Sequence, residues 1–139
     1  MAIETPFITA DGIVEVYTKG IFQGVVLIER LNTPYGTALP GGFMDIGETI
    51  EVCLKREMSE EIGLDVQIIS LLGLYSDPKR DPRFHTVSAV YICKADALPT
   101  AGDDAKSTKL VSLEKLLDEN YVFDHKNIIE DYLKTKSLG

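Results

Sequence analysis

The sequence predicts an α/β fold in which a mixed β-sheet packs between helices, and two observations support this prediction. The chain has 139 residues, of which 45% are hydrophobic and 26% charged, values typical of one domain that buries its own core. Segments that favour strands come first, one helical segment follows, and further strand-like and then helical segments come after it. We therefore expect a single domain over residues 1–139.

The first two predicted strands cover Ile13–Tyr17 and Gly24–Arg30. Both are rich in Val and Ile, and the turn segment between them contains Lys19-Gly20. The stretch from Leu31 to Gly47 holds six Gly and Pro residues, so we expect a loop with little regular structure there. A helix should follow this loop, because Thr49 is a good N-cap and Gly63 can stop a helix that runs to Ile62.

The second half of the chain continues with strands and ends with helices. Leu64–Tyr75 and Phe84–Lys94 favour strands, with a polar turn over Ser76–Pro82 between them. Pro99–Lys106 is expected to be an acidic loop. Two terminal helices should follow, one capped by Ser112 and one by Asp124. Their expected inward residues are Leu113, Leu116 and Leu117 in the first and Ile128, Ile129, Tyr132 and Leu133 in the second.

Charge and cysteine content narrow the classes of function. The net charge is −8 and the isoelectric point is near 4.7, and such a surface repels the phosphate backbone of a nucleic acid polymer. A small anionic ligand would need local arginines or a metal ion. Cys53 and Cys93 form no metal-binding motif and are expected to be buried thiols in a reducing compartment. No secretory signal is visible and the longest apolar runs have four residues, so we expect a cytoplasmic protein without a membrane span.

The predicted helix carries an unusual set of acidic residues. Ile50, Cys53 and Leu54 form an apolar patch on its first turns, and a glutamate stands seven residues after each of them. Because positions seven apart nearly superimpose on a helix, the core-facing stripe should become three carboxylates, with Met58 and Ile62 continuing an apolar edge beside them. A divalent cation would remove the repulsion among them, so a metal site and a solvated acidic face both stay open on this geometry. The three residues are Glu57, Glu60 and Glu61.

The loop and helix together resemble the Nudix box. The run from Gly42 to Glu48, seven intervening residues, and the run Arg56-Glu-Met-Ser-Glu-Glu-Ile-Gly-Leu64 match that signature without a departure, after a typical Leu39-Pro-Gly lead-in. The resemblance implies an α/β/α sandwich that hydrolyses a nucleoside diphosphate linked to another moiety, with Mg²⁺ or with Mn²⁺ in its place. It assigns a support role to Glu48 and Arg56, which should hold the loop and the helix together.

The same resemblance assigns the catalytic and metal-binding roles. By matching positions, Glu57, Glu60 and Glu61 are the catalytic, metal-binding glutamates, and the carbonyl of Gly42 is a backbone ligand. Hard oxygen donors of this kind suit Mg²⁺, which keeps other positions for water and substrate phosphate. Two adjacent glycines would alternatively form only a tight turn.

Two further segments are similar to the ADP-ribose pyrophosphatase branch of this family. They run from Tyr75 to His85 and from Phe123 to Ile129. This similarity implies hydrolysis of ADP-ribose, or a related nucleotide sugar, to AMP and a sugar phosphate. It also implies a homodimer, because relatives in this branch are often dimers.

The arginines near these segments are the candidates for binding the substrate's phosphates. Arg80 and Arg83 lie in the turn, and Arg30 ends the second strand. Guanidinium groups suit diphosphate oxygens, although an ordinary surface turn would also carry arginines. Base recognition stays open, because Ala38 stands where many relatives carry an aromatic residue; Tyr35 and Phe22 are the alternatives.

Two features of the reaction stay open at this point. The general base could be one of the box glutamates or the Asp103-Asp104 pair in the acidic loop. The activity could instead be a sanitising nucleoside triphosphate pyrophosphohydrolase, or the domain could sense ADP-ribose without catalysis.

Overall fold

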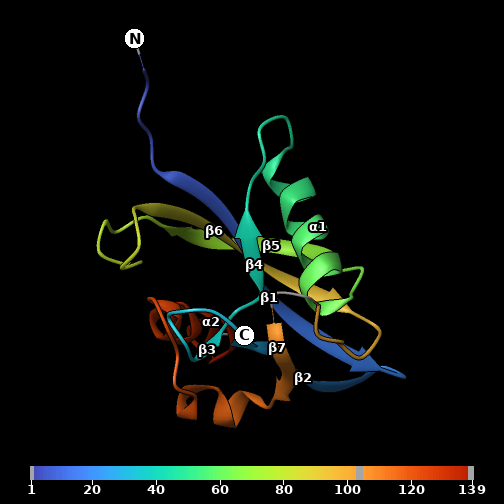
Figure 1. The fold of residues 1–139 in the computed structure, drawn as a ribbon. Coiled ribbons are helices and arrows are strands. Elements are labelled where there is room, and N and C mark those ends of the chain that lie inside the picture. Colours follow the sequence, from blue (N-terminus) through green and yellow to red (C-terminus); the bar gives the residue numbers. More distant parts are fainter. Residues whose placement is uncertain (1, 103–104, 138–139) are drawn as a thin grey trace.

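The computed structural model describes residues 2–102 and 105–137 (Figure 1). A mixed sheet runs through its centre in the order β3-β2-β1-β6-β5, with β4 also paired to β1 and β7 to β2. Strand β1 pairs in parallel with β6, whereas the other strand pairs are antiparallel. The strands are β1 (Phe7–Thr18), β2 (Ile21–Arg30), β3 (Thr37–Ala38), β4 (Gly41–Phe43), β5 (Gln67–Tyr75), β6 (Thr86–Ala95) and β7 (Ala105–Val111).

Helices cover both faces of this sheet, which confirms the predicted sandwich. Helix α1 (Ile50–Ile62) packs on one face, and the 3-10 helix η1 (Leu113–Asp118) and helix α2 (His125–Ser137) pack on the other (Figure 1). The side chains of β1 alternate between two hydrophobic cores, because successive residues of a strand point to opposite faces. Ala10, Val14 and Val16 enter the core under α1, whereas Ile13 enters the core under α2.

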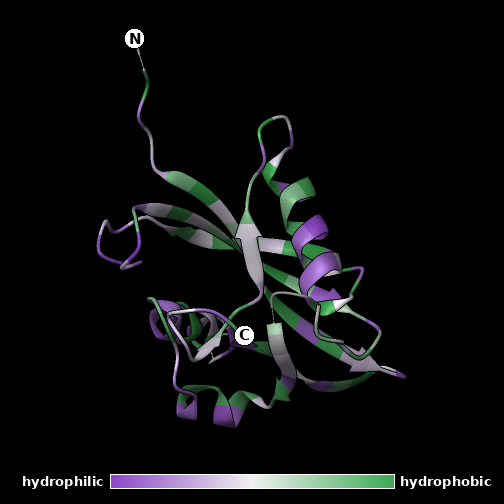
Figure 2. Ribbon diagram, viewed as in Figure 1, coloured by the Kyte–Doolittle hydropathy of each residue, from purple (hydrophilic) through white to green (hydrophobic). Residues whose placement is uncertain are grey.

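Helix α1 begins and ends where the sequence predicts. The N–H of Val52 donates to the Thr49 side chain at 3.2 Å, and Gly63 ends the helix in the left-handed conformation with φ 66°, which glycine adopts without a steric penalty. Its buried stripe follows the predicted apolar edge and does not become the three glutamates. Met58 and Ile62, four and eight residues after Leu54, continue the apolar stripe to the end of the helix, so the glutamates lie beside it. Figure 2 shows the change from hydrophobic to hydrophilic residues along α1.

Three strand predictions need correction. Strand β1 begins at Phe7 rather than Ile13, because parallel pairing with β6 holds the polar residues Thr9 and Asp11 in the sheet. The loop after β2 contains the short strands β3 and β4. The acidic loop gives way at Ala105 to β7, which pairs with β2 although its sequence is largely polar.

The C-terminal helices occur where expected, although Ser112 does not cap the first one with its side chain. The Ser112 side chain makes no capping hydrogen bond, and the first segment is a 3-10 helix. Leu116 is buried as predicted, whereas Leu117 is exposed. In α2 the side chains of Ile128, Ile129 and Tyr132 are fully buried. No helix in the described part of the chain is long and apolar enough to span a bilayer.

Candidate active site

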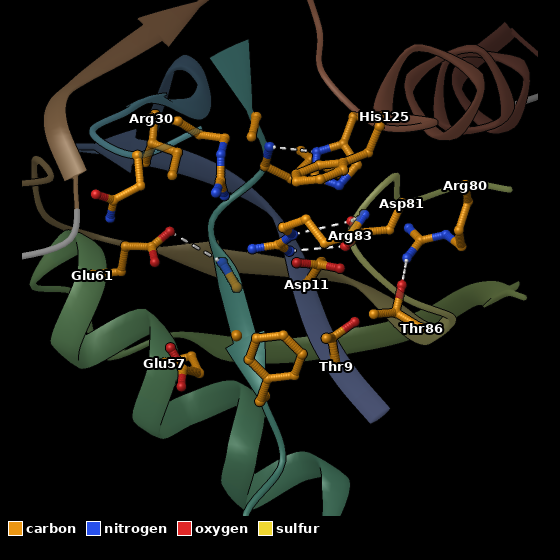
Figure 3. Close-up of a pocket in the computed structure, with 18 of the residues that line it drawn as sticks. Thr9, Asp11, Arg30, Glu57, Glu61, Arg80, Asp81, Arg83, Thr86 and His125 are labelled. Carbon is orange, nitrogen blue, oxygen red and sulfur yellow. Dashed lines mark hydrogen bonds and ion pairs between the residues drawn. The ribbon is translucent and has the colours of Figure 1, made fainter. Parts of the chain in front are cut away.

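A cavity of about 400 Å³ lies where β1, β4 and α1 approach the segments around residues 80–86 and 123–125. Glu57 and Glu61 of α1 line one side, and Arg83 lies across from them beside Asp11 and Asp81 (Figure 3). The cavity brings together Gly42, Glu57, Glu61, Arg30, Arg80 and Arg83 from the sequence-predicted site.

The backbone of the β4 loop contacts the glutamates of α1 directly. The N–H of Gly41 donates to a Glu61 carboxylate oxygen at 3.3 Å. A Cβ placed on Gly42 would lie 2.3 Å from the Glu57 carboxyl group, so only a glycine allows this approach. The Glu57 side chain is 15% exposed, whereas that of Glu60 is 61% exposed and is not among the residues that line the cavity. The structure thus groups Gly42 with two of the three predicted metal-binding glutamates.

Arg56 joins the loop to the helix, which confirms the predicted support role. Its Nη2 and Nε donate to the two carboxylate oxygens of Glu48 at 2.6 and 3.0 Å, and Nη2 also donates to the Phe43 carbonyl at 3.0 Å. These hydrogen bonds lower the pKa of Glu48 to about 2, because they stabilise its ionised form. Arg56 Nη1 lies 2.7 Å from a Glu57 oxygen and 3.2 Å from a Glu60 oxygen. Arg56 therefore orients a cavity glutamate as well as the loop.

The donor set at this place fits a hard divalent cation. Within residues 2–102 and 105–137, no three His, Cys, Asp or Glu side chains gather closely enough to hold a metal by themselves. Two carboxylates with a nearby backbone carbonyl match the way Mg²⁺ binds, with one or two carboxylates and the remaining positions left to water and substrate phosphate. The close packing of Gly42 on Glu57 brings the backbone of β4 next to one of these carboxylates.

The three predicted arginines differ in their partners. Arg80 is buried; it donates to both carboxylate oxygens of Asp124 at 2.9 and 2.7 Å and to the Thr86 hydroxyl at 2.7 Å. Arg83 donates to both oxygens of Asp81 at 3.0 and 2.8 Å. Such paired hydrogen bonds fix a guanidinium firmly, so Arg80 primarily joins its turn to the start of α2.

Arg30 has a different environment from the other two arginines. Its Nε donates to the Pro34 carbonyl at 2.8 Å and its Nη2 to the Thr33 carbonyl at 3.3 Å. Burial and the neighbouring Arg83 cation lower the pKa of Arg30. Among the residues that the structure describes, no carboxylate forms an ion pair with it. Arg30 is therefore suited to meet an anionic ligand.

Three buried titratable residues that the sequence analysis does not assign to the site line the cavity, namely Asp11, Asp81 and His125. Asp11 accepts a hydrogen bond from the Ser88 hydroxyl, and burial raises its pKa to about 6. His125 accepts a hydrogen bond at Nδ1 from the Leu39 N–H at 3.0 Å, and burial, with the Arg80 and Arg30 charges, lowers its pKa to about 3. Asp11 lies before the predicted start of its strand, so it was not expected in the sheet beside the site. His125 directly follows Asp124, the expected cap of the last helix, and was assigned only to that helix.

Of the other residues considered for the site, those that the structure describes contribute little to this cavity. His85 Nε2 lies 2.9 Å from the Ser76 carbonyl, which is a local structural contact. Tyr35 is exposed and Phe22 packs on Tyr17 at 5.5 Å, and neither lines the cavity. The Asp103-Asp104 pair lies outside the described residues. Cys53 and Cys93 are buried and unpaired, as expected.

Two curated proteins are similar to this chain over most of its length. The chain is 43% identical over 135 residues to the ADP-ribose pyrophosphatase of Methanocaldococcus jannaschii, covering 95% of this chain and 76% of that protein. It is 28% identical to the ADPR responsive transcriptional repressor NtrR of Acinetobacter baylyi, covering 91% of this chain and 52% of that protein.

A solved structure shares the fold of this chain, and a family model matches its sequence. The NUDIX domain of Shewanella oneidensis NrtR, solved as a cocrystal with ADP ribose, has a TM-score of 0.83 at 24% identity. The match covers 96% of this chain and 90% of that one and shows a shared fold. The NUDIX domain model matches residues 7–132. Since that match spans nearly all of the sequence, the chain belongs to the NUDIX domain family.

Proposed function

We propose that this protein hydrolyses the pyrophosphate bond of ADP-ribose, or of a related nucleotide sugar, to AMP and a sugar phosphate. The observation that carries the proposal is the cavity in which Glu57, Glu61 and Gly42 face Arg30 and Arg83. A diphosphate needs cations on more than one side, and this cavity offers arginines on one and a carboxylate cation site on the other. The 43% identity with an archaeal ADP-ribose pyrophosphatase supports the same substrate.

Each cavity residue has a role that follows from its contacts. Nudix hydrolases generally need divalent metal ions, and we propose Mg²⁺, with Mn²⁺ able to replace it, held by Glu57, Glu61 and the Gly42 carbonyl. Such an ion, when bound, neutralises charge on the diphosphate and makes water more acidic. Arg56 holds Glu57 in place, and Arg30 and Arg83 bind phosphate oxygens. Glu60 remains a proposed ligand that would have to turn in from its exposed position.

A substrate panel with Mg²⁺ tests the proposal. ADP-ribose, NADH, diadenosine polyphosphates and nucleoside triphosphates are compared by kcat/KM, with the products separated by chromatography. We expect ADP-ribose to be preferred and to give AMP and ribose 5-phosphate. A preference for triphosphates with release of pyrophosphate would instead identify a sanitising pyrophosphohydrolase and contradict the proposal.

Glutamate variants test whether the cavity is the catalytic centre. Glu57→Gln and Glu61→Gln should each abolish most of the turnover, because the amide loses the charge that holds a cation. Glu51→Gln is the matched control, since Glu51 is an exposed glutamate of the same helix outside the cavity. Unchanged turnover in both cavity variants would disprove the catalytic assignment.

A second candidate is an ADP-ribose sensor without catalysis, which the similarity to a transcriptional repressor responsive to ADPR favours. Calorimetry distinguishes the two. A sensor would bind ADP-ribose and leave it intact over hours in Mg²⁺, whereas the enzyme would convert it.

Two further properties are part of the proposal. We propose a homodimer, which light scattering on the purified protein would test against a monomer mass of 15.4 kDa. We also propose a cytoplasmic location. The two buried, unpaired cysteines support it, because thiols stay reduced in that compartment.

A further inference from the structure

Phe123 adopts a backbone conformation that is unusual for a bulky residue. Its φ is 57°, in the left-handed region, where a side chain with a Cβ clashes with the backbone. Such a conformation is unfavourable and persists only where surrounding contacts enforce it. Glycine or asparagine would fit this position more easily, so the phenylalanine ring itself requires an explanation.

The neighbours of Phe123 are anchored on both sides. The Val122 N–H donates to the Thr37 carbonyl at 3.0 Å, which ties the chain to β3. Asp124 accepts two hydrogen bonds from the buried Arg80. Between these anchors the chain turns sharply, and the Phe123 ring lies along the cavity wall.

The ring contacts the two arginines that face the diphosphate site. The guanidinium carbon of Arg30 lies 5.0 Å from the centre of the Phe123 ring, and that of Arg83 lies 5.2 Å from the same centre. Arg83 also lies 5.1 Å from the centre of the Phe84 ring. These contacts join three segments that are far apart in the sequence, at Arg30, at Arg83-Phe84 and at Phe123.

An aromatic ring is well suited to hold two cations near each other. Like charges repel, but the negative face of the ring attracts both guanidinium groups. Stacking uses the flat face of an arginine and leaves its N–H edge for hydrogen bonds. In the described part of the chain, Nη1 of Arg30 and Nη1 of Arg83 have no hydrogen-bond acceptor, whereas their Nε and Nη2 atoms do. Each arginine thus keeps donors for a ligand.

We propose that Phe123 is a positioning residue that holds Arg30 and Arg83 as one paired cationic subsite for the substrate's diphosphate. This inference rests on the proposed function, because it names the device that orients the substrate at that site. It also explains why a strained aromatic residue stands at this turn. The ring acts through the arginines and does not touch the reacting atoms.

A series of fluorinated phenylalanines at position 123 tests the electrostatic part of the proposal. Fluorine weakens the negative face of the ring while changing its size little. The affinity for α,β-methylene ADP-ribose, measured by calorimetry with Mg²⁺, should fall step by step from phenylalanine through mono- and trifluoro- to pentafluorophenylalanine. We expect a total loss of about tenfold, with kcat for ADP-ribose unchanged within about twofold. The same series at Phe22 is the matched control and should be flat, because Phe22 packs on Tyr17 and, among the described residues, no arginine stacks on its ring.

The Phe123→Leu variant provides a second measurement, since leucine keeps an apolar side chain but has no π face. It should raise the KM for ADP-ribose about tenfold, and Phe123→Trp should restore most of the affinity. An affinity that does not change along the fluorinated series would overturn the inference and leave the proposed function intact. If the unsubstituted protein fails to bind the methylene analogue, the proposed function fails and this inference falls with it.

Discussion

Substitution of Gly42 by alanine should separate the fold of this protein from its activity. The added Cβ would lie 2.3 Å from the Glu57 carboxyl carbon and from one of its oxygens. An ordinary van der Waals contact begins at 3.4 Å, so the carboxylate must move by about 1.1 Å. Because Glu57 ends in a flexible carboxylate, it can move without disrupting the sheet, and the fold should survive.

The displacement should nevertheless be costly for catalysis. A shift of about 1 Å in a catalytic group can reduce the rate about 100-fold, which corresponds to about 2.7 kcal/mol of lost transition-state stabilisation. Moving Glu57 also pulls it away from Arg56, whose Nη1 lies 2.7 Å from it. We therefore expect kcat/KM for ADP-ribose to fall about 100-fold and the melting temperature to change by only a few degrees.

The assay compares Gly42→Ala with Gly73→Ala. A Cβ on Gly73, a strand glycine outside the cavity, would meet its nearest atom at 3.6 Å, an ordinary contact. Turnover with Mg²⁺, Mn²⁺ affinity by electron paramagnetic resonance, and thermal unfolding are measured for both variants. Wild-type turnover in Gly42→Ala would refute the reasoning, as would a loss of activity that Gly73→Ala shares.

Three further predictions concern the buried charges. Arg80→Met should reduce the free energy of unfolding by about 3–5 kcal/mol in urea titrations, because it leaves Asp124 without its partner; an unchanged stability would contradict the structural role of Arg80. His125 has a pKa of about 3 in the folded chain against 6.5 when unfolded, so its contribution is present above pH 6.5 and is lost as the pH falls towards 3. In thermal melts, the free energy of unfolding of His125→Asn should therefore fall less steeply with decreasing pH than that of the wild type, by up to about 1.4 kcal/mol per pH unit. An equally steep fall would refute this. Asp11 acts in the opposite sense, because its folded pKa of about 6 exceeds 3.8: its contribution is full below pH 3.8 and is lost as the pH rises through 6. Between these pH values, the free energy of unfolding of Asp11→Asn should fall more steeply with decreasing pH than that of the wild type. A shallower fall would count against the buried environment of Asp11.

The helix and its flanking loop could be predicted from sequence because their signals are local. Thr49 and Gly63 mark the ends of α1 by their own backbone preferences. The spacing of Gly42 and the glutamates identifies the family directly. What the helical repeat could not give is the exposure of Glu60, because the repeat places a residue on a face of the helix and does not show which other segments cover that face.

The rest of the site depends on contacts between distant segments. Arg80 stands 44 residues before its partner Asp124, and nothing local to either residue distinguishes an ion pair from a phosphate ligand. Strand β7 forms because β2 offers it an edge, although its own residues favour strands weakly. The strained turn at Phe123 results from anchors in β3 and at Arg80, so its backbone conformation could not be read from the residue type.

The alternation of β1 between the two cores has a consequence for how this protein can vary. Removing a single residue from the middle of the strand would turn every later side chain to the opposite face. Ile13 and Val14 would exchange cores at once, and neither core could adjust without the other. The strand can therefore accept changes of side chain but not of length, which leaves insertions and deletions to the loops at the rim.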